Sequence, residues 1–199
     1  MARVADPMAK SKLLKAAREE FASSGLAGAR VEDIAKRAAL SKGSFYLHFE
    51  SKEEAFLHVV NQFFTDLARM TEECTIKIET IKTVDEFREK LVGSDNQIFE
   101  FCWQNRDVVR VLHESGHREY EHLLSGFLDA LSMMIEANIV ELQRRGLYRK
   151  DVDAKVASWS ITGSYNNLVR QMTKAKTKPD LQMWIQSITR MCTAGLEKR

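Results

Sequence analysis

The segment "GLAGARVEDIAKRAALSKGSFYLHFESKEEAF", Gly25 to Phe56, contains the strongest structural signal in the chain. Its apolar residues recur at spacings of three and four, which is typical of helices. Residues 31–38 suffice for barely two helical turns, and Ser41 is a good N-cap for a second short helix. Helices of this length are not stable alone, so both must pack against longer neighbours.

Longer helices are predicted on both sides of this segment. The helix before it is expected to end at Gly25, and Ser51 with Glu54 forms a capping box that begins a helix reaching about Cys74. Helical periodicity then continues over residues 84–104, 107–115, 118–145, 153–174 and 180–197. We therefore predict an all-α chain of about nine helices.

The composition supports this fold class and limits the function. The 199 residues include only nine Gly and two Pro, so helix breakers are few. Cys74, Cys102 and Cys192 lack CxxC spacing, which argues against a disulfide framework. No apolar leader begins the sequence and no run approaches eighteen apolar residues. We expect a cytoplasmic protein without a membrane partner.

Basic charge is concentrated near the N-terminus. Residues 1–52 hold ten Lys or Arg and six Asp or Glu, a net charge of +4, whereas residues 53–199 hold twenty and twenty-two, a net charge of −2. The excess is mild support for an anionic partner beside the two short helices.

Two short helices joined by a tight turn form a helix-turn-helix unit, whose second helix enters the major groove of double-stranded DNA. The second helix is predicted to begin at Lys42. Lys42 and Ser44 are the first candidates for contact with base edges, followed by Tyr46 and Leu47, and Gly43 lets the backbone approach the duplex. The residues predicted to contact phosphates are His48, Lys52 and Arg30.

The same segment closely resembles the DNA-binding segment of the TetR family of bacterial transcriptional regulators. The resemblance implies a helix-turn-helix DNA-binding domain over residues 1–52 and an effector-binding and dimerisation domain over residues 53–199. It implies a regulator rather than an enzyme, without a cofactor, and favours a repressor that binds a palindromic operator as a homodimer. The matching residues are Gly25, Val31, Asp33, Ile34, Ala35, Ala38, Leu40, Ser41, Lys42, Gly43, Phe45, Tyr46, His48, Phe49, Ser51, Lys52 and Glu53.

The sequence departs from the family pattern at two positions. The turn between the two short helices usually holds Gly where this chain has Ala39, so a positive φ there would strain the alanine. The first short helix is usually capped by Ser or Thr, and Arg30 in that position cannot accept the same N–H bonds.

The resemblance places an effector pocket among the middle helices. The candidate residues are large, soft or aromatic, with a few polar anchors, which favours an apolar or aromatic small molecule. Each of them taken singly also suits an ordinary core position. They are Phe99, Trp103, Gln104, His113, Phe127, Met133, Met134, Trp159, Tyr165 and Asn166.

The last two predicted helices are candidates for a four-helix dimer interface. Small residues in the first and a regular apolar stripe in the second suit close helix packing. The alternative is that both stripes bury against the chain's own core. The predicted interface residues are Trp159, Gly163, Leu181, Trp184, Ile185, Ile188 and Met191.

A rival hypothesis rests on "HESGH", His113 to His117, which matches the HExxH pattern of zinc peptidases. Gly116 interrupts the motif, whereas a zinc site needs both histidines on one uninterrupted helical face. A metal-responsive regulator using His113 and His117 is the more reasonable form of this hypothesis, and a peptidase is the weaker one.

Overall fold

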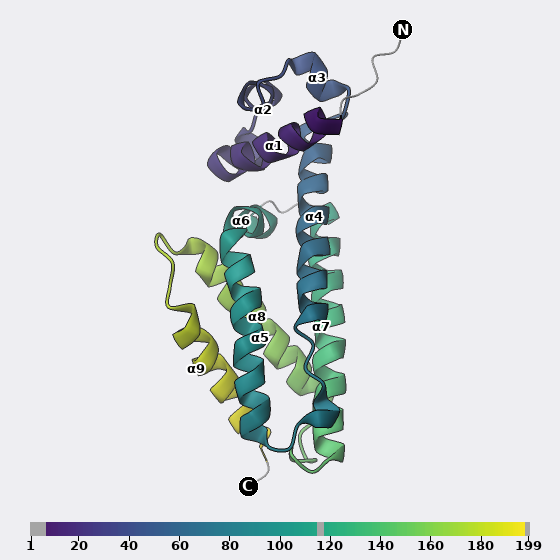
Figure 1. Ribbon diagram of the computed structural model, residues 1–199, viewed down its shortest axis with the longest axis vertical. Helices are drawn as coiled ribbons and strands as arrows, with labels where there is room; N and C mark the ends of the chain where they lie inside the picture. The colour runs from purple at the N-terminus through teal and green to yellow at the C-terminus, as the bar shows by residue number, and fades with distance from the viewer. Residues whose placement is uncertain (1–6, 115–117, 198–199) are drawn as a thin grey trace. The chain divides into compact units, whose positions relative to one another are not determined.

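The computed structural model describes residues 7–114 and 118–197 of the chain. Within these residues it is all-α, as predicted, with one isolated bridge between Tyr148 and Glu197. Figure 1 shows the order of the elements. They are α1 (Pro7–Gly28), α2 (Val31–Arg37), α3 (Lys42–Tyr46), α4 (Lys52–Glu73), the 3-10 turn η1 (Ile78–Thr80), α5 (Val84–Gln104), α6 (Arg106–Glu114), α7 (Arg118–Arg144), α8 (Ala154–Lys174) and α9 (Leu181–Ala194).

The local signals in the sequence mark the observed boundaries well. Gly25 has a φ of 67° and kinks α1, which continues for one short turn to Gly28. Ser51 accepts a 3.1 Å bond from the Glu54 amide at the start of α4, while the Glu54 carboxylate accepts from the amide of Glu50, one residue earlier than a standard capping box. Helix α9 is shorter than predicted, and η1 was not anticipated.

The contacts divide the chain into two compact units. The first contains the described residues up to Asp66 together with those from Asn105 to Leu123, and the second contains Leu67–Gln104 and the described residues from Leu124 onward. The predicted division at residue 52 concerns functional roles and stays a prediction. Helix α6, which follows α5 in sequence, therefore packs with α1 in the first unit.

Aromatic side chains fill the core of the first unit. The Phe56 ring meets Phe21 edge to face at 5.1 Å and Tyr120 at 4.8 Å between centroids, and Phe45 lies 5.3 Å from Phe49. Edge-to-face pairs add stability beyond the area they bury. This core joins α1, α3, α4 and the start of α7, so the short helices rest on long ones as the sequence requires.

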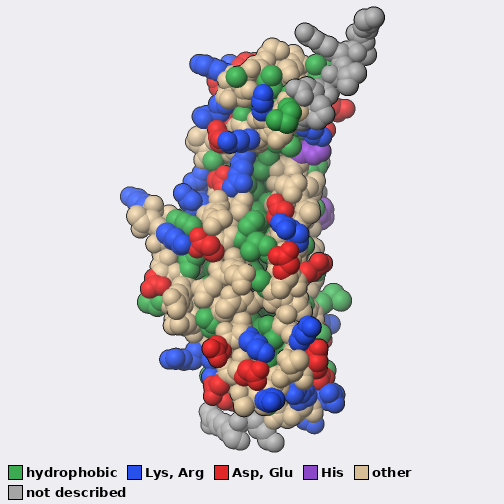
Figure 2. Space-filling model, viewed as in Figure 1, with side chains coloured by type: hydrophobic (Ala, Val, Ile, Leu, Met, Phe, Trp, Pro, Cys, Tyr) green, Lys and Arg blue, Asp and Glu red, His purple; other side chains and the backbone are tan. Residues whose placement is uncertain are grey.

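The second unit has a separate core and a charged surface. Its buried cluster draws on η1, α5, α7, α8 and the C-terminal segment that follows α9. Exposed ion pairs such as Arg144 with Glu141 and Arg149 with Asp151 surround it. Figure 2 shows basic and acidic side chains interspersed over the lower part of the visible face, so that part carries no single-sign field.

One described helix could cross a membrane by length and composition alone. The stretch Tyr120–Arg144 of α7 contains an 18-residue window of mean hydropathy 1.4, only 11% of which is buried. This corrects the expectation that no such stretch exists. A single helix of this kind is weak evidence for a membrane, and its apolar exposed face equally suits contact with another protein surface.

The turn between α2 and α3 contains Ala39 at a φ of 55°. The left-handed region is strained for residues with a Cβ, so the predicted conflict at this position is confirmed. We expect Ala39→Gly to raise the free energy of unfolding by roughly 0.5 to 1 kcal/mol, measured by urea denaturation. Ala38→Gly is the matched control, because Ala38 has an ordinary φ of −74°; it should lower stability. Equal effects of both substitutions would contradict the strain.

Candidate functional site

Helices α2 and α3 form the predicted helix-turn-helix unit (Figure 1). Ser41 caps α3 by accepting a 3.1 Å bond from the Ser44 amide, as the sequence indicates. Arg30 precedes α2 without making a side-chain cap, which confirms the second departure from the family pattern. The unit is thus fixed by one cap rather than two.

The two faces of α3 differ sharply. Phe45 is fully buried, whereas Tyr46 and the following Leu47 are 50% and 58% exposed. Lys42 and Gly43 are exposed, and Ser44 and His48 are half-buried. The helix therefore presents a polar and aromatic surface while its opposite side packs on the protein.

Gly43 is not required by the packing of the chain itself. A Cβ at this position would meet Ser41 Oγ at 3.7 Å, an ordinary contact, and the backbone does not have a positive φ. Glycine in a helix lowers stability relative to alanine. A glycine that the fold does not need is consistent with the predicted close approach of a partner at this end of α3.

An ion pair connects α2 to the start of α3. Lys42 Nζ donates to Glu32 Oε1 at 2.6 Å, and both side chains are about half exposed. The hydrogen bond from Lys42 lowers the pKa of Glu32, and the same bond raises the pKa of Lys42. Arg30 lies 3.9 Å from the same carboxylate. Glu32 was not among the sequence candidates, because ten residues separate it from Lys42 and only the turn brings them together.

Lys52 has a structural partner that the sequence did not reveal. Its Nζ donates to the carbonyl oxygens of Ala27 and Ala29, each at 3.0 Å. Carbonyls at a helix end lack intrahelical partners, and a lysine is a suitable donor for them. Lys52 thus fastens the start of α4 to the end of α1, and its predicted phosphate contact would use an ammonium already held in place.

The predicted effector residues are distributed over both units. Phe99 and Tyr165 meet at 5.9 Å between ring centroids in the second unit, whereas His113 belongs to the first. Met133 and Trp159 are 71% and 57% exposed in the single chain, so their assignment to an enclosed pocket stays a prediction. Trp103, Phe127, Met134 and Asn166 are half-buried, and Gln104 is exposed.

Sequence reasoning missed the acidic group beside Phe99. Asp95 on α5 is buried and accepts a hydrogen bond from the Tyr165 hydroxyl on α8. Burial raises the pKa of Asp95 to about 7, although the bond from Tyr165 acts in the opposite direction. The signal was available in the sequence, because Leu91, Asp95, Phe99 and Cys102 share one helical stripe in which only Asp95 is polar.

The predicted dimer interface is partly wrong. Leu181, Ile185 and Ile188 are buried within a single chain, where α9 packs against α5. A residue buried in its own core cannot contact a partner, so these three leave the predicted set. Trp159, Gly163 and Met191 are exposed, and Trp184 is half-buried. The exposed face of α9 also includes Met183.

The HESGH hypothesis falls partly outside the described residues, because His117 lies in the undescribed range 115–117. His113 is at the end of α6 and is half-buried. Over residues 7–114 and 118–197, no group of three or more His, Cys, Asp or Glu side chains could hold a metal ion.

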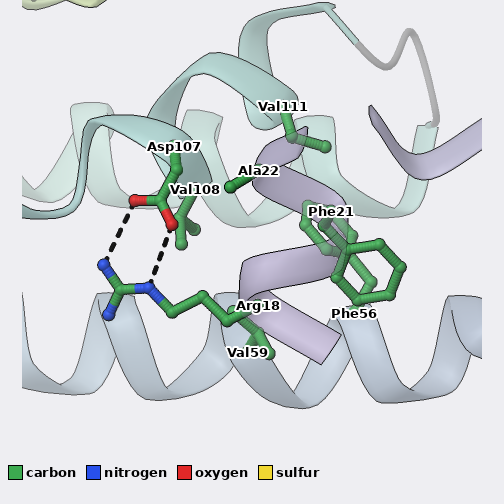
Figure 3. A pocket seen from close by; sticks show the side chains of 8 residues that line it. All are labelled: Arg18, Phe21, Ala22, Phe56, Val59, Asp107, Val108 and Val111. Atoms are coloured by element: carbon green, nitrogen blue, oxygen red, sulfur yellow. Dashed lines mark hydrogen bonds and ion pairs between the residues drawn. The ribbon is translucent and has the colours of Figure 1, made fainter. Parts of the chain in front are cut away.

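Helix α6 is fastened to α1 by polar contacts around a small apolar recess (Figure 3). Arg18 donates two 3.1 Å bonds to the Asp107 carboxylate, and Arg110 donates to the carbonyl of Ala22 at 2.6 Å. The recess beside them has no room for even a water molecule. It is a packed joint between α1, α4 and α6 rather than a ligand pocket.

A short capped helix with one buried face and one free face, held by longer helices, defines a helix-turn-helix DNA-binding protein. The profile described as "Bacterial regulatory proteins, tetR family" matches residues 13–59, which include all of this unit. The match to this segment, together with similar proteins over the rest of the chain, supports a transcriptional regulator of the TetR type.

Similar proteins extend the likeness beyond the DNA-binding segment. The transcriptional regulator YdgC of Bacillus subtilis (strain 168) is 24% identical over 80% of this chain and 78% of its own. The transcriptional repressor DhaR of Mycobacterium sp. (strain GP1) is 25% identical over 88% of each chain. The structure of FadR from Bacillus subtilis, in complex with stearoyl-CoA, has a TM-score of 0.71 at 22% identity and covers 93% of this chain and 98% of that one. This structural likeness shows a shared fold.

Glu32 should restrain Lys42 in the free protein. We expect Glu32→Gln to tighten binding to a duplex of random sequence by about three- to tenfold at low salt, since it releases the ammonium and removes a negative charge from the face of α2 and α3. Fluorescence anisotropy at 50 and 200 mM salt measures this. Glu79→Gln, an exposed residue of the second unit, has the same change in net charge and should have little effect. Weaker binding by Glu32→Gln would mean that the carboxylate itself contacts DNA.

Asp95 predicts an unusual dependence of stability on pH. Its folded pKa of about 7 lies above the ordinary value of 3.8, so the folded state holds the proton longer and stability falls as the pH rises between these values. The Asp95→Asn variant has no ionisable group at this position, so its stability does not fall with pH in this way. We expect the variant to gain on the order of 4 kcal/mol relative to the parent between pH 4 and pH 8, with no further gain above. Urea unfolding measures this, and parallel pH curves would contradict it.

Proposed function

We propose that the protein is a cytoplasmic repressor that binds a palindromic operator as a homodimer and leaves it when a small-molecule effector binds. The observation that carries the DNA-binding part is the free face of α3, with Lys42, Tyr46 and Leu47 exposed above the buried Phe45. In this proposal Lys42 and Ser44 contact base edges first, and the exposed Tyr46 and Leu47 extend the contact.

Contacts with phosphates fix the position of the unit on the duplex. We assign them to Arg30, His48 and Lys52, which lie around α3 in sequence. Lys52 has a double role in this proposal, because its ammonium both holds the end of α1 and remains half exposed. Its free donor position is available to a phosphate beside the N-terminus of α4, where the helix dipole also favours an anion.

A dimer follows from the small size of the DNA-binding unit. A helix of five residues offers few base contacts, and twofold symmetry doubles them by placing two such helices about 34 Å apart along one face of B-DNA. The exposed side chains of Trp159 on α8, and of Met183 and Met191 on α9, support an interface formed by the outer faces of these helices. This interface uses the same two helices as the predicted one. It is formed by the exposed face of α9 instead of the face that is buried within the chain.

Release by an effector needs a connection to the DNA-binding unit. Helix α6 follows α5 after one residue and is fastened to α1 through Arg18, Asp107 and Arg110. A shift at the end of α5 would therefore act on α1. Changing occupancy from 99:1 to 1:99 requires about 5.5 kcal/mol of differential affinity, a reasonable demand on two pockets of a dimer. That a relative is named a repressor, and that a neighbour holds stearoyl-CoA, supports this order of events.

Selection from random duplexes tests the proposal. We expect a palindromic sequence whose half-sites are centred about one helical turn apart. Lys42→Ala should then reduce discrimination against single-base changes by about tenfold, measured by competitive anisotropy. Lys150→Ala, an exposed lysine of the second unit, is the control for lost charge and should leave discrimination unchanged. A selected sequence without symmetry, or equal losses for both variants, would reject the proposal.

A further inference from the structure

Asp95 is a buried carboxyl group without a cationic partner. It is 8% exposed, and its interactions are those of an apolar site with one hydrogen bond, from the neutral hydroxyl of Tyr165. In the part of the chain that the structure describes, no lysine or arginine pairs with it. Buried carboxylates are normally paired with a cation, because the charged form is costly in an apolar environment. A buried acid that lacks one is a candidate for a binding site.

Two buried hydroxyl groups on α8 and α9, the first of which also carries Tyr165, lack hydrogen-bond partners as well. Among the described residues, the side-chain oxygens of Thr162 and Thr189 are buried without a hydrogen bond. Burial raises the pKa of Tyr165, and Thr189 on α9, which lies beside the phenol without meeting the geometry of a hydrogen bond, acts in the opposite direction. Thr162 is one helical turn before Tyr165 on α8. Native interiors satisfy nearly all such groups, so a buried hydroxyl without a partner beside Tyr165, the hydrogen-bond donor to Asp95, is unusual.

The surroundings of this cluster are largely apolar. The Phe99 ring contacts Tyr165 at 5.9 Å, and Phe99 lies one turn after Asp95 on α5. The half-buried thiol of Cys192 on α9 completes the neighbourhood, since the charge of Asp95 adds to the burial that raises the pKa of this thiol. An occupant must therefore combine an apolar body with a polar head.

The polar groups determine the chemistry of that head. A carboxylate accepts hydrogen bonds only, whereas a hydroxyl can both donate and accept. A protonated amine has three donors and a positive charge, so it can bind the Asp95 carboxylate and a threonine hydroxyl together. A carboxylate or phosphate head would face a buried acid of like charge, which disfavours it.

We propose that Asp95, Tyr165 and Thr189 form the head-group site of the effector, and that the effector is an apolar amine. The role of the bound amine as an effector rests on the proposed function. The amine-binding site itself does not depend on that function. The amine takes the position beside Asp95 that the Tyr165 hydroxyl occupies in the free protein. The site accounts for the buried acid and for the orphan hydroxyl on α9.

Three probes with the same chain and different heads test the site on the full-length protein in the absence of DNA. They are dodecylamine, dodecanol and dodecanoate, used below their micelle concentrations and measured by isothermal titration calorimetry, with circular dichroism to verify that the protein stays folded. We expect the amine to bind at least about tenfold more tightly than the alcohol and the carboxylate to bind most weakly. Equal binding of amine and carboxylate would overturn the proposal.

Variants separate the head-group site from general attraction of the amine. Asp95→Asn keeps the shape of the side chain and an acceptor for Tyr165, and should weaken the amine about tenfold while leaving the alcohol within about twofold. Thr189→Val should weaken the amine by a smaller factor. Glu79→Gln removes one exposed negative charge and should leave amine binding unchanged. Unchanged amine binding by both Asp95→Asn and Thr189→Val would also overturn the proposal.

Release from DNA is measured separately, by adding dodecylamine to a preformed operator complex. Binding that depends on Asp95, together with release, supports both the site and the proposed function. Binding that depends on Asp95 without release leaves the site in place and rejects its role in regulation. The two failures are therefore distinguishable.

Discussion

Burial of the Phe45 side chain determines which side of a five-residue helix is free. Helix α3 is too short to hold its own conformation, so its orientation depends on this anchor and on the cap from Ser41. With Phe45 fixed on the aromatic core, Tyr46 and Leu47 necessarily point outward. The contact between Lys52 and the end of α1 holds the other end of the unit. DNA recognition in this protein thus depends first on packing and only then on charge.

The charged side chains of the DNA-binding unit pair with one another. Lys42 would otherwise be a free cation on the exposed face, yet Glu32 accepts its hydrogen bond in the absence of DNA. An exposed pair of this kind adds little to folding stability, because water screens both partners. Its effect falls instead on binding, since any anion that uses Lys42 must compete with a carboxylate. This competition weakens binding to a duplex that offers only phosphates to Lys42. It weakens binding less where the duplex also offers a hydrogen-bond donor to Glu32, so the ion pair favours specificity over affinity.

The sequence predicts the features of this fold that depend on local chemistry. The caps at Ser41 and Ser51, the kink at Gly25 and the strain at Ala39 all follow from which groups can donate, accept or adopt a positive φ. Periodicity also locates most ends of the long helices within a residue or two, although α1 and α9 each end three residues from the predicted position. It cannot say what covers an apolar stripe, because the α9 residues Leu181, Ile185 and Ile188 would look the same against a partner subunit or against α5. The pairing of Glu32 with Lys42 is likewise invisible until the turn brings them together.

The pKa of Asp95 relates ligand binding to the free energy of the buried charge. Raising a carboxyl pKa from 3.8 to about 7 corresponds to on the order of 4 kcal/mol of unfavourable free energy for its charged form. A bound ammonium that compensates this charge can recover part of that amount, and only in a conformation that admits the ligand. Reversing occupancy of the operator needs roughly 5.5 kcal/mol of differential affinity, which two such sites in a dimer would share. A single buried acid in each chain therefore contributes to release only where the ligand-bound conformation moves α5 and, through it, the joint between Asp107 and Arg18.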